Sequence, residues 1–184
     1  MDPTVSSTPL WVFAYGSLLW DPGFTPAEAV TAELRGFARS FCMLSIHHRG
    51  TEAEPGLVLA LDAQDGAACT GVALRVKDAE KAAVLGMLRA RELISSAYVE
   101  FQVQVWLQDG RQVTALAYVI DPAHPQYCQF DAETQARMIL RAQGGRGPNR
   151  EYLYNTAAHL AQLGIADPAL TALVRRVRAL CAAG

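Results

Sequence analysis

The chain has 184 residues, 51% of them apolar, and its formal net charge at pH 7 is −2. This length suits a single domain, residues 1–184, that buries roughly 70% of its unfolded surface. The nearly balanced charge removes the electrostatic argument for nucleic acid or an anionic membrane as a partner. The opening residues lack a basic segment and the apolar run from Val12 to Trp20 is too short to span a bilayer, so we expect a cytoplasmic protein.

The first predicted strand ends in a turn whose backbone is free to bind a ligand. Trp11 to Tyr15 is aromatic and β-branched and carries no charge, which is typical of a buried strand. Gly16 permits a sharp turn or the close approach of a ligand, and Ser17 adds a hydroxyl group. Main-chain N–H groups of such a turn have no strand partner, so they bind water or a ligand oxygen.

Turn residues and alternating apolar residues divide the next part of the chain into short elements. A polar tail, residues 1–10, is expected to be loosely held. Asp21-Pro22-Gly23-Phe24 predicts a turn, and Thr25-Pro26-Ala27-Glu28 has the pattern of a capping box that begins one helical turn. The predicted strands are Glu33–Phe37, Ser40–His47, Leu57–Leu61 and Gly71–Val76, with a turn at Asp62–Gly66 before the last.

The remaining chain predicts one helix, one hairpin and a helical end. Asp78 can cap a helix that reaches Arg91, and Asp109-Gly110 turns the strand Tyr98–Leu107 into the strand Gln112–Ile120. Three further helices are expected: one capped by Asp131 that ends at Ala142, one capped by Asn149 that ends at Leu163 before Gly164, and a last one that starts at Asp167-Pro168. Strands fill the first two thirds and helices fill the end. The sequence therefore predicts an α+β fold with a largely antiparallel sheet or small barrel.

Four cysteines are widely separated and offer no close pair of the metal-binding kind: Cys42, Cys69, Cys128 and Cys181. They can form two disulfides, but nothing in the sequence indicates export, so we expect buried free thiols. His47 and His48 are adjacent, and adjacent side chains of a strand point to opposite faces. The sequence therefore argues against a zinc site at these histidines.

The usual sequence signals of catalysis are absent, since there is no Walker loop, dinucleotide fingerprint, His-Glu-x-x-His motif or nucleophile elbow. Gly144-Gly145-Arg146-Gly147 lacks the spacing of a phosphate loop and precedes a proline, so we interpret it as a loop that breaks a helix. Glu92 follows two arginines at the C-terminal end of a helix, where the helix dipole disfavours a carboxylate. Taken alone, Glu92 is an ordinary solvated residue and Tyr152 an amphipathic core residue.

Four motifs nevertheless occur together in a fixed order. They are Val-Phe-x-Tyr-Gly-Ser-Leu-Leu-Trp near the start, His48-Arg49-Gly50-Thr51 before Pro55-Gly56-Leu57-Val58, Arg91-Glu92 before Tyr98, and Gly147-Pro148-Asn149 before Glu151-Tyr152-Leu153. Over about residues 11–163 this series resembles the ChaC-type γ-glutamylcyclotransferases.

The resemblance implies a γ-glutamylcyclotransferase-like barrel with flanking helices and a lyase that converts glutathione to 5-oxoproline and cysteinylglycine without a cofactor. It also implies site residues. Glu92 is then the catalytic acid and base, and Tyr152 is a further residue of the site. The segment that binds the γ-glutamyl group consists of Ala14, Tyr15, Gly16, Ser17 and Leu18.

Three residues depart from the pattern of this family. Ala14 stands where many relatives have glycine, and His47 replaces a common aspartate. Val99 stands where an arginine often follows the tyrosine. The change at Val99 bears on substrate preference more than on chemistry, because Glu92 is in place.

Two other functions stay open at this stage. One is the same chemistry on another γ-glutamyl peptide or amine. The other is a non-catalytic protein of the same fold that binds a metabolite. Glu92 argues against the second, because binding alone needs no acid or base. The sequence does not address the oligomeric state.

Overall fold

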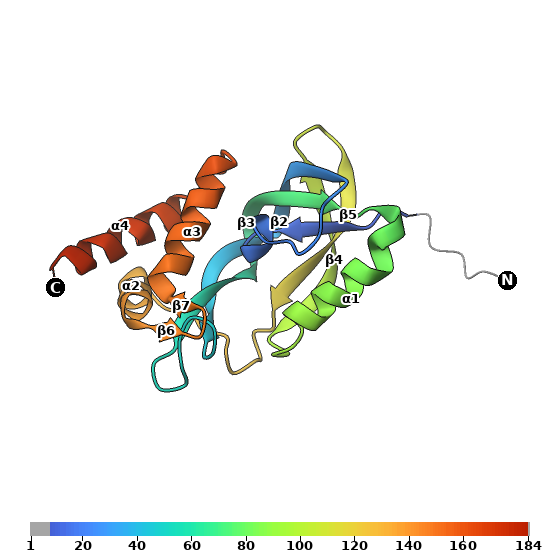
Figure 1. The fold of residues 1–184 in the computed structure, drawn as a ribbon. Helices are drawn as coiled ribbons and strands as arrows, with labels where there is room; N and C mark the ends of the chain where they lie inside the picture. Colours follow the sequence, from blue (N-terminus) through green and yellow to red (C-terminus); the bar gives the residue numbers. More distant parts are fainter. Residues whose placement is uncertain (1–7, 184) are drawn as a thin grey trace.

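A computed structural model describes residues 8–183, in which five strands close into a barrel (Figure 1). The strand order is β1-β3-β2-β4-β5, with antiparallel neighbours throughout and a parallel pairing of β1 with β5 that closes the barrel. The predicted α+β class with a small, largely antiparallel barrel is confirmed. The strands are β1 (Trp11–Ala14), β2 (Glu28–Ser45), β3 (Gly56–Arg75), β4 (Tyr98–Leu107) and β5 (Gln112–Ile120).

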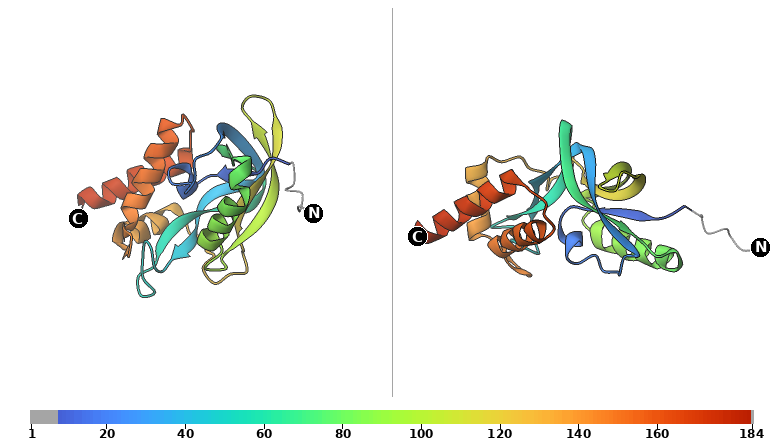
Figure 2. Two further views of the ribbon diagram at one scale, coloured as in Figure 1. Left: turned by 45° about the vertical axis from the view of Figure 1, so that its right-hand side comes forward. Right: turned by 90° about the horizontal axis from the view of Figure 1, so that it is seen from above.

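The helices form two groups on different sides of the barrel. In Figure 1 and in both views of Figure 2, α2, α3 and α4 lie together at one end of the molecule, and α1 lies apart from them along the barrel. A short hairpin, β6 (Gln143–Gly144) and β7 (Gly147–Pro148), precedes α3. No helix within residues 8–183 is long and apolar enough to cross a membrane. The helices are α1 (Lys81–Glu92), α2 (Ala132–Arg141), α3 (Asn149–Gln162) and α4 (Pro168–Ala183).

Strand β1 contributes to two cores because its side chains alternate between its faces. Trp11 and Phe13 pack inside the barrel, whereas Val12 and Ala14 pack in the core that includes the helices. All four residues are buried. A Cβ at Gly71 would collide with the Ala14 carbonyl oxygen, so β3 approaches β1 this closely only with glycine there. The turn after β1 is thereby anchored on a rigid strand.

Strands β2 and β3 are longer than predicted. The two strands expected in residues 33–47 are one strand, and so are the two expected in residues 57–76. The turn expected at Asp62–Gly66 does not reverse the chain. Arg35 pairs with Ala68 and Phe37 with Ala63, so the intervening residues of β3 form a bulge on the same partner strand. The turn residues at positions 62–66 produce this local bulge, but β3 continues because the residues before and after the bulge both pair with β2.

Sheet pairing also overrules the helical turn predicted at Thr25–Glu28. The main-chain N–H of Ala27 donates to the Arg75 carbonyl at 2.8 Å, and Glu28 already pairs with Arg75 at the start of β2. Asp78 does not cap α1 as predicted. A 3₁₀ turn, Asp78–Glu80, comes first, and the Asp78 carboxylate pairs with Lys81 at 2.9 Å. In both segments, residues that could cap a helix instead pair with a neighbouring strand or with a charged side chain.

The later elements agree better with the sequence. Strands β4 and β5 have the predicted bounds, and Asp131 caps α2 by accepting from the Thr134 N–H at 2.8 Å. Cys42, Cys69 and Cys128 are buried free thiols as predicted, but Cys181 is exposed. Cys181 lies in the last turn of α4, beyond Val177, the last buried residue of that helix.

The predicted loose tail, residues 1–10, lies largely outside the described residues. Its last part is held by hydrogen bonds. The Lys81 ammonium donates to the Thr8 carbonyl, and the Val76 N–H donates to the Leu10 carbonyl, both at 2.8 Å.

Candidate active site

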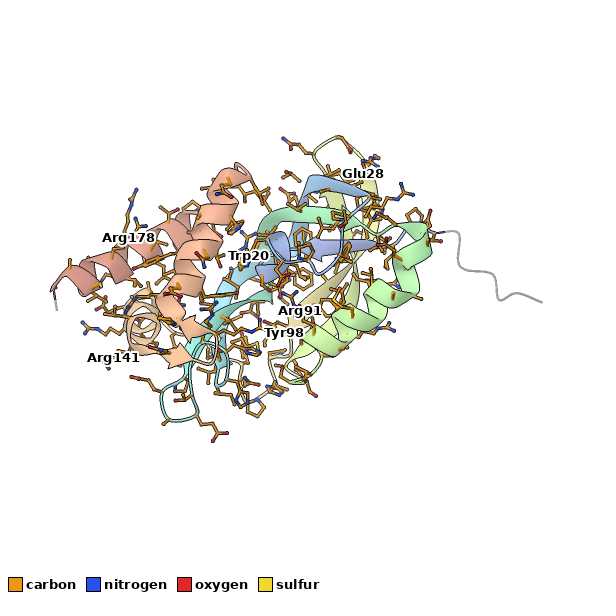
Figure 3. The ribbon with its side chains drawn as sticks, viewed as in Figure 1. Trp20, Glu28, Arg91, Tyr98, Arg141 and Arg178 are labelled. Atoms are coloured by element: carbon orange, nitrogen blue, oxygen red, sulfur yellow. The ribbon has the colours of Figure 1, made fainter. Side chains whose placement is uncertain are left out.

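A cavity of about 520 Å³ brings the four sequence motifs to one place. Three of its lining residues are labelled in Figure 3: Arg91 and Tyr98 lie beside α1, and Trp20 lies on the side of α3. Its volume falls within the range of small-molecule sites. The lining residues used below are Tyr15, Gly16, Ser17, Leu18, His47, His48, Arg49, Leu59, Arg91, Glu92, Tyr98, Tyr118, Arg146 and Tyr152.

The turn after β1 exposes main-chain N–H groups to this cavity. Residues Ser17–Leu19 form one 3₁₀ turn, closed by the Leu19 N–H, which donates to the Gly16 carbonyl at 2.9 Å. The first N–H groups of a helical turn have no partner within it. No residue in the range 8–183 accepts a hydrogen bond from the N–H of Gly16, Ser17 or Leu18. This turn can therefore bind a ligand oxygen.

Tyr15 and Arg39 hold the turn in place. The Tyr15 hydroxyl donates to the Tyr118 carbonyl at 2.8 Å, and the Tyr15 carbonyl accepts from Arg39 Nε at 2.8 Å. Arg39 is only 5% exposed and also pairs with Asp167, the residue before α4, at 3.0 Å. A buried guanidinium needs such partners, because leaving it unpaired would cost several kcal/mol. Hydrogen bonds of the Tyr15 side chain and of the Tyr15 backbone thus both hold the start of the turn in position.

Glu92 is the last residue of α1, and its side chain is 16% exposed. Arg91 Nε lies 3.2 Å from Glu92 Oε1, but the two atoms are not aligned as a hydrogen bond, and no described residue hydrogen-bonds this oxygen. Burial raises the pKa of the Glu92 carboxyl, and the charge of Arg91 opposes this rise without cancelling it. A raised pKa with a free oxygen suits a carboxylate that accepts and returns a proton.

Arg91 connects Glu92 to the turn. One guanidinium nitrogen donates to the Asp21 carbonyl at 2.7 Å, and another donates to the Ser17 hydroxyl at 3.1 Å. The planar guanidinium with its several donors can bind these partners at once. Arg91 therefore fixes the position of the Glu92 carboxylate relative to the turn. From the sequence alone, Arg91 was known only as the neighbour of Glu92 in the chain.

Two tyrosines complete the wall at Leu59 on β3. The Tyr98 hydroxyl donates to the Leu59 carbonyl at 2.9 Å, and the Tyr152 hydroxyl accepts from the Leu59 N–H at 3.2 Å. Burial, with the nearby Glu92 charge adding to it, raises the pKa of Tyr152 to about 12 and also raises the pKa of Tyr98 well above its usual value. Tyr152 therefore stays protonated at neutral pH, and its own O–H remains available as a donor to a ligand.

Asn149 joins two of the motifs. It is fully buried, and its side chain accepts from the Leu57 N–H at 2.7 Å and donates to the Leu57 carbonyl at 2.8 Å. The predicted helix cap at Asn149 was wrong, because Pro148 occupies the capping position. A Cβ at Gly56 would collide with the Arg49 carbonyl and with Asn149, so glycine permits this close packing.

The predicted site residues are mostly brought together. Tyr15, Gly16, Ser17, Leu18, Glu92 and Tyr152 all line the cavity. Ala14 does not, because its side chain is fully buried in the core. Arg49 and Tyr98 also line the cavity, and both stand inside the sequence motifs, which is the signal that could have identified them. Arg146 lies in the glycine-rich segment that we interpreted only as a helix-breaking loop, and nothing in the sequence pointed to Tyr118.

The two adjacent histidines lie differently from the prediction. Strand β2 ends at Ser45, so His47 and His48 follow it in a loop, and both line the cavity. The argument that they point to opposite faces of a strand was therefore wrong. Among residues 8–183, no three His, Cys, Asp or Glu side chains are grouped so as to hold a metal ion.

The sequence as a whole matches the family model described as ChaC-like protein over residues 10–180. The chain belongs to the ChaC-like family. This ChaC-like protein is 38% identical to the glutathione-specific γ-glutamylcyclotransferase of Escherichia coli (strain K12), over 95% of this chain and 75% of the relative. It is 35% identical to glutathione-specific γ-glutamylcyclotransferase 1 of Homo sapiens, over 91% and 78%.

A solved structure supports the fold of this ChaC-like protein. The yeast γ-glutamylcyclotransferase specific to glutathione superimposes with a TM-score of 0.83 at 24% sequence identity. The superposition covers 94% of this chain and 96% of the yeast chain. The γ-glutamylcyclotransferase-like barrel expected from the sequence motifs is therefore confirmed.

Proposed function

We propose that this ChaC-like protein is a γ-glutamylcyclotransferase that cleaves glutathione to 5-oxoproline and cysteinylglycine. The observation that carries the proposal is the buried, partly unpaired carboxylate of Glu92 in one cavity with the free N–H groups of the Gly16–Leu18 turn. The bacterial and human relatives that bear this name support it.

The substrate of this reaction supplies its own nucleophile. The α-amine of the glutamyl group attacks the γ-carbonyl carbon, a five-membered ring closes, and the bond to the cysteine nitrogen breaks. Because attack is intramolecular, the protein mainly has to hold the curled conformer, for which effective molarities reach on the order of 10⁵ M or more. The closed wall of Tyr15, Tyr98 and Tyr152 suits that task.

Glu92 is the group that we assign to proton transfer. The amine must lose a proton before it attacks, and moving that proton from a group of pKa about 7.7 to a solvated glutamate near 4.3 costs roughly 4.6 kcal/mol. Each unit by which burial raises the pKa of Glu92 removes about 1.4 kcal/mol of this cost. The same carboxyl then returns the proton to the departing cysteine nitrogen.

We assign to the Gly16–Leu18 turn the stabilisation of the negative charge that develops on the γ-carbonyl oxygen during attack. Its N–H groups have no described partner, and its residues line the cavity in a turn that Tyr15 and Arg39 hold in place. Preorganised donors of this kind usually supply the largest electrostatic contribution to catalysis. The Tyr152 hydroxyl, which keeps its proton, is a further donor within the same wall.

Release of 5-oxoproline tests the function directly. The purified protein is incubated with glutathione, with other γ-glutamyl peptides and with γ-glutamyl amines, and the ring product is quantified. Preference for glutathione supports the proposal. Preference for an amine favours the alternative substrate class, and no release from any compound favours the non-catalytic alternative.

Activity is expected to be indifferent to chelators and to thiol reagents. Ring closure needs neither an activated water nor a covalent side chain, which are what usually recruit a metal or a nucleophile–histidine pair. Burial raises the pKa of Cys42 to about 12 and those of Cys69 and Cys128 to about 11, so these thiols are poor nucleophiles at neutral pH. Iodoacetamide should label exposed Cys181 while 5-oxoproline release continues.

The same experiment includes EDTA and a serine-directed fluorophosphonate. The Ser17 hydroxyl accepts from Arg91, and no histidine among the described residues hydrogen-bonds it. Loss of activity with EDTA that zinc restores would contradict the mechanism. So would stoichiometric labelling of Ser17 that tracks inactivation.

The pH dependence should respond to Arg91. Glu92 must be ionised to accept the proton, so activity falls as pH drops through its raised pKa. Arg91 lowers that pKa, so Arg91→Gln should move the acid limb of kcat/KM to higher pH as well as reduce kcat. Arg89→Gln is the matched control, since Arg89 pairs with Glu100 outside the cavity. An acid limb that stays in place or moves to lower pH in Arg91→Gln would contradict the assignment.

A further inference from the structure

One rim of the cavity carries positive charge that has no anionic partner. His47, His48, Arg49 and Arg146 all line it. Within residues 8–183, no carboxylate lies within 4.0 Å of the guanidinium of Arg49 or Arg146. Arg91, the other lining arginine, differs because it pairs with Glu92 and Asp21. We name the set His47, His48, Arg49 and Arg146 the cationic rim.

Two loops that are distant in sequence build this rim. The N–H of Gly145 donates to the His47 carbonyl at 2.8 Å, and the N–H of Arg146 donates to the His48 carbonyl at 2.9 Å. A Cβ at Gly144 would collide with the backbone of residues 48–50, so glycine lets the β6–β7 hairpin lie directly on the loop. The backbone thus holds four basic side chains side by side.

The positive charges of the rim act on one of its own members. The pKa of His48 is lowered, first by burial and then by the positive charges of Arg146, His47 and Arg49. Like charges held together in this way raise the local positive potential, and a cavity wall focuses it. An anionic group of a ligand is the partner that this potential favours.

Contacts place the rim at the end of the cavity beyond Tyr152. The Tyr152 hydroxyl lies 3.8 Å from the position that a Cβ of Gly16 would take, and the Arg49 guanidinium lies 5.7 Å from the centre of the Tyr152 ring. Arg49 also donates to the Pro148 carbonyl at 3.3 Å, which fixes it beside β7. Tyr152 therefore contacts both the Gly16–Leu18 turn and Arg49, and Arg49 adjoins the hairpin that carries Arg146.

We infer that Arg49 and Arg146 bind the carboxylate at the far end of a γ-glutamyl peptide and thereby select peptides over γ-glutamyl amines. This inference rests on the proposed function, because it takes the γ-glutamyl group to lie at the turn and Glu92. The remainder of an extended substrate then reaches the rim. A guanidinium binds a carboxylate with paired, charge-assisted hydrogen bonds.

The test compares two substrates that differ by one charge. They are glutathione and its C-terminal amide, in which the glycine carboxylate is replaced by a neutral group while the γ-glutamyl bond is kept. The variant is Arg146→Gln, since Arg146 is exposed and its side chain is not needed for packing. Arg150→Gln is the matched control. Arg150 lies four residues after Arg146, is also exposed and does not line the cavity, so this change removes the same charge outside the site.

For Arg146→Gln we expect KM for glutathione to rise about 3- to 10-fold, with kcat nearly unchanged and KM for the amide unchanged. Arg150→Gln should match the original protein on both substrates. The original protein should prefer glutathione, and this preference should shrink as salt is added, because exposed charges are screened. The double change Arg49→Gln with Arg146→Gln should remove most of the preference.

Equal kcat/KM for the two peptides in the original protein would overturn the inference while leaving the cyclotransferase proposal intact. An equal loss on both peptides in Arg146→Gln would overturn it as well. If no 5-oxoproline forms at all, the proposed function fails, and calorimetric titration with the two peptides still tests the rim. The inference is supported if glutathione binds more tightly than its C-terminal amide and if Arg146→Gln weakens the binding of glutathione. Equal binding of the two peptides overturns it.

Discussion

Glu92→Gln is expected to fold normally and to lose roughly 10²- to 10⁴-fold in kcat. The amide keeps the shape of the side chain but can neither take the proton from the substrate amine nor return it to the leaving nitrogen. Substrate binding should survive, because the turn and the cationic rim are unchanged. Rate measurements with saturating glutathione separate the two effects.

Thermal unfolding provides the control for this variant. In the folded protein the pKa of Glu92 is raised, so the folded state holds a proton more tightly than the unfolded state. The ionised side chain therefore costs stability above its folded pKa, a cost that is relieved as pH falls and that glutamine never incurs. Glu92→Gln should be at least as stable as the original protein at neutral pH. Glu80→Gln, with a side chain that is 43% exposed and lies outside the cavity, should keep full activity.

Two results would count against the assignment. A kcat above about a tenth of the original value would show that Glu92 is not the acid and base. A large fall in thermal stability at neutral pH would show that the ion pair with Arg91 stabilises the fold by more than burial of the carboxylate costs.

Gly16→Val is expected to lower kcat/KM by roughly 10²-fold or more and to remove detectable binding of glutathione. The expected cause is the space that the new side chain occupies. Gly16 has a φ of −135°, so the left-handed conformation that often requires glycine is not used here. Its Cβ would lie 3.8 Å from both Leu59 and the Tyr152 hydroxyl, and the two methyl groups of valine would extend beyond that into the substrate site.

Calorimetric titration with glutathione measures this effect. Gly86→Val on α1 makes the same change where a Cβ would meet nothing within 4 Å, so it controls for the substitution itself. Ser17→Ala should be milder than Gly16→Val, because the backbone N–H groups remain. If Gly16→Val binds glutathione as tightly as the original protein, the turn is structural and the site lies elsewhere in the cavity.

Features that short stretches of chain encode were predictable from the sequence alone. The hairpin of β4 and β5 has its expected bounds, because Asp109-Gly110 and alternating apolar residues lie next to each other in the chain. Asp131 caps α2 through the N–H of Thr134, three residues away. Glu92 and the Tyr15–Leu18 turn were identified from motif order, and the cavity contains both.

Other features were decided only by partners distant in the chain. Residues 62–66 carry turn signals, yet β3 continues because its neighbours on both sides pair with β2. The Asn149 side chain binds the Leu57 backbone instead of a helix end. The rim arises because residues 144–146 lie against residues 47–48. Such contacts depend on which strands and loops become neighbours after folding. Local patterns of residue type do not specify these long-range neighbours.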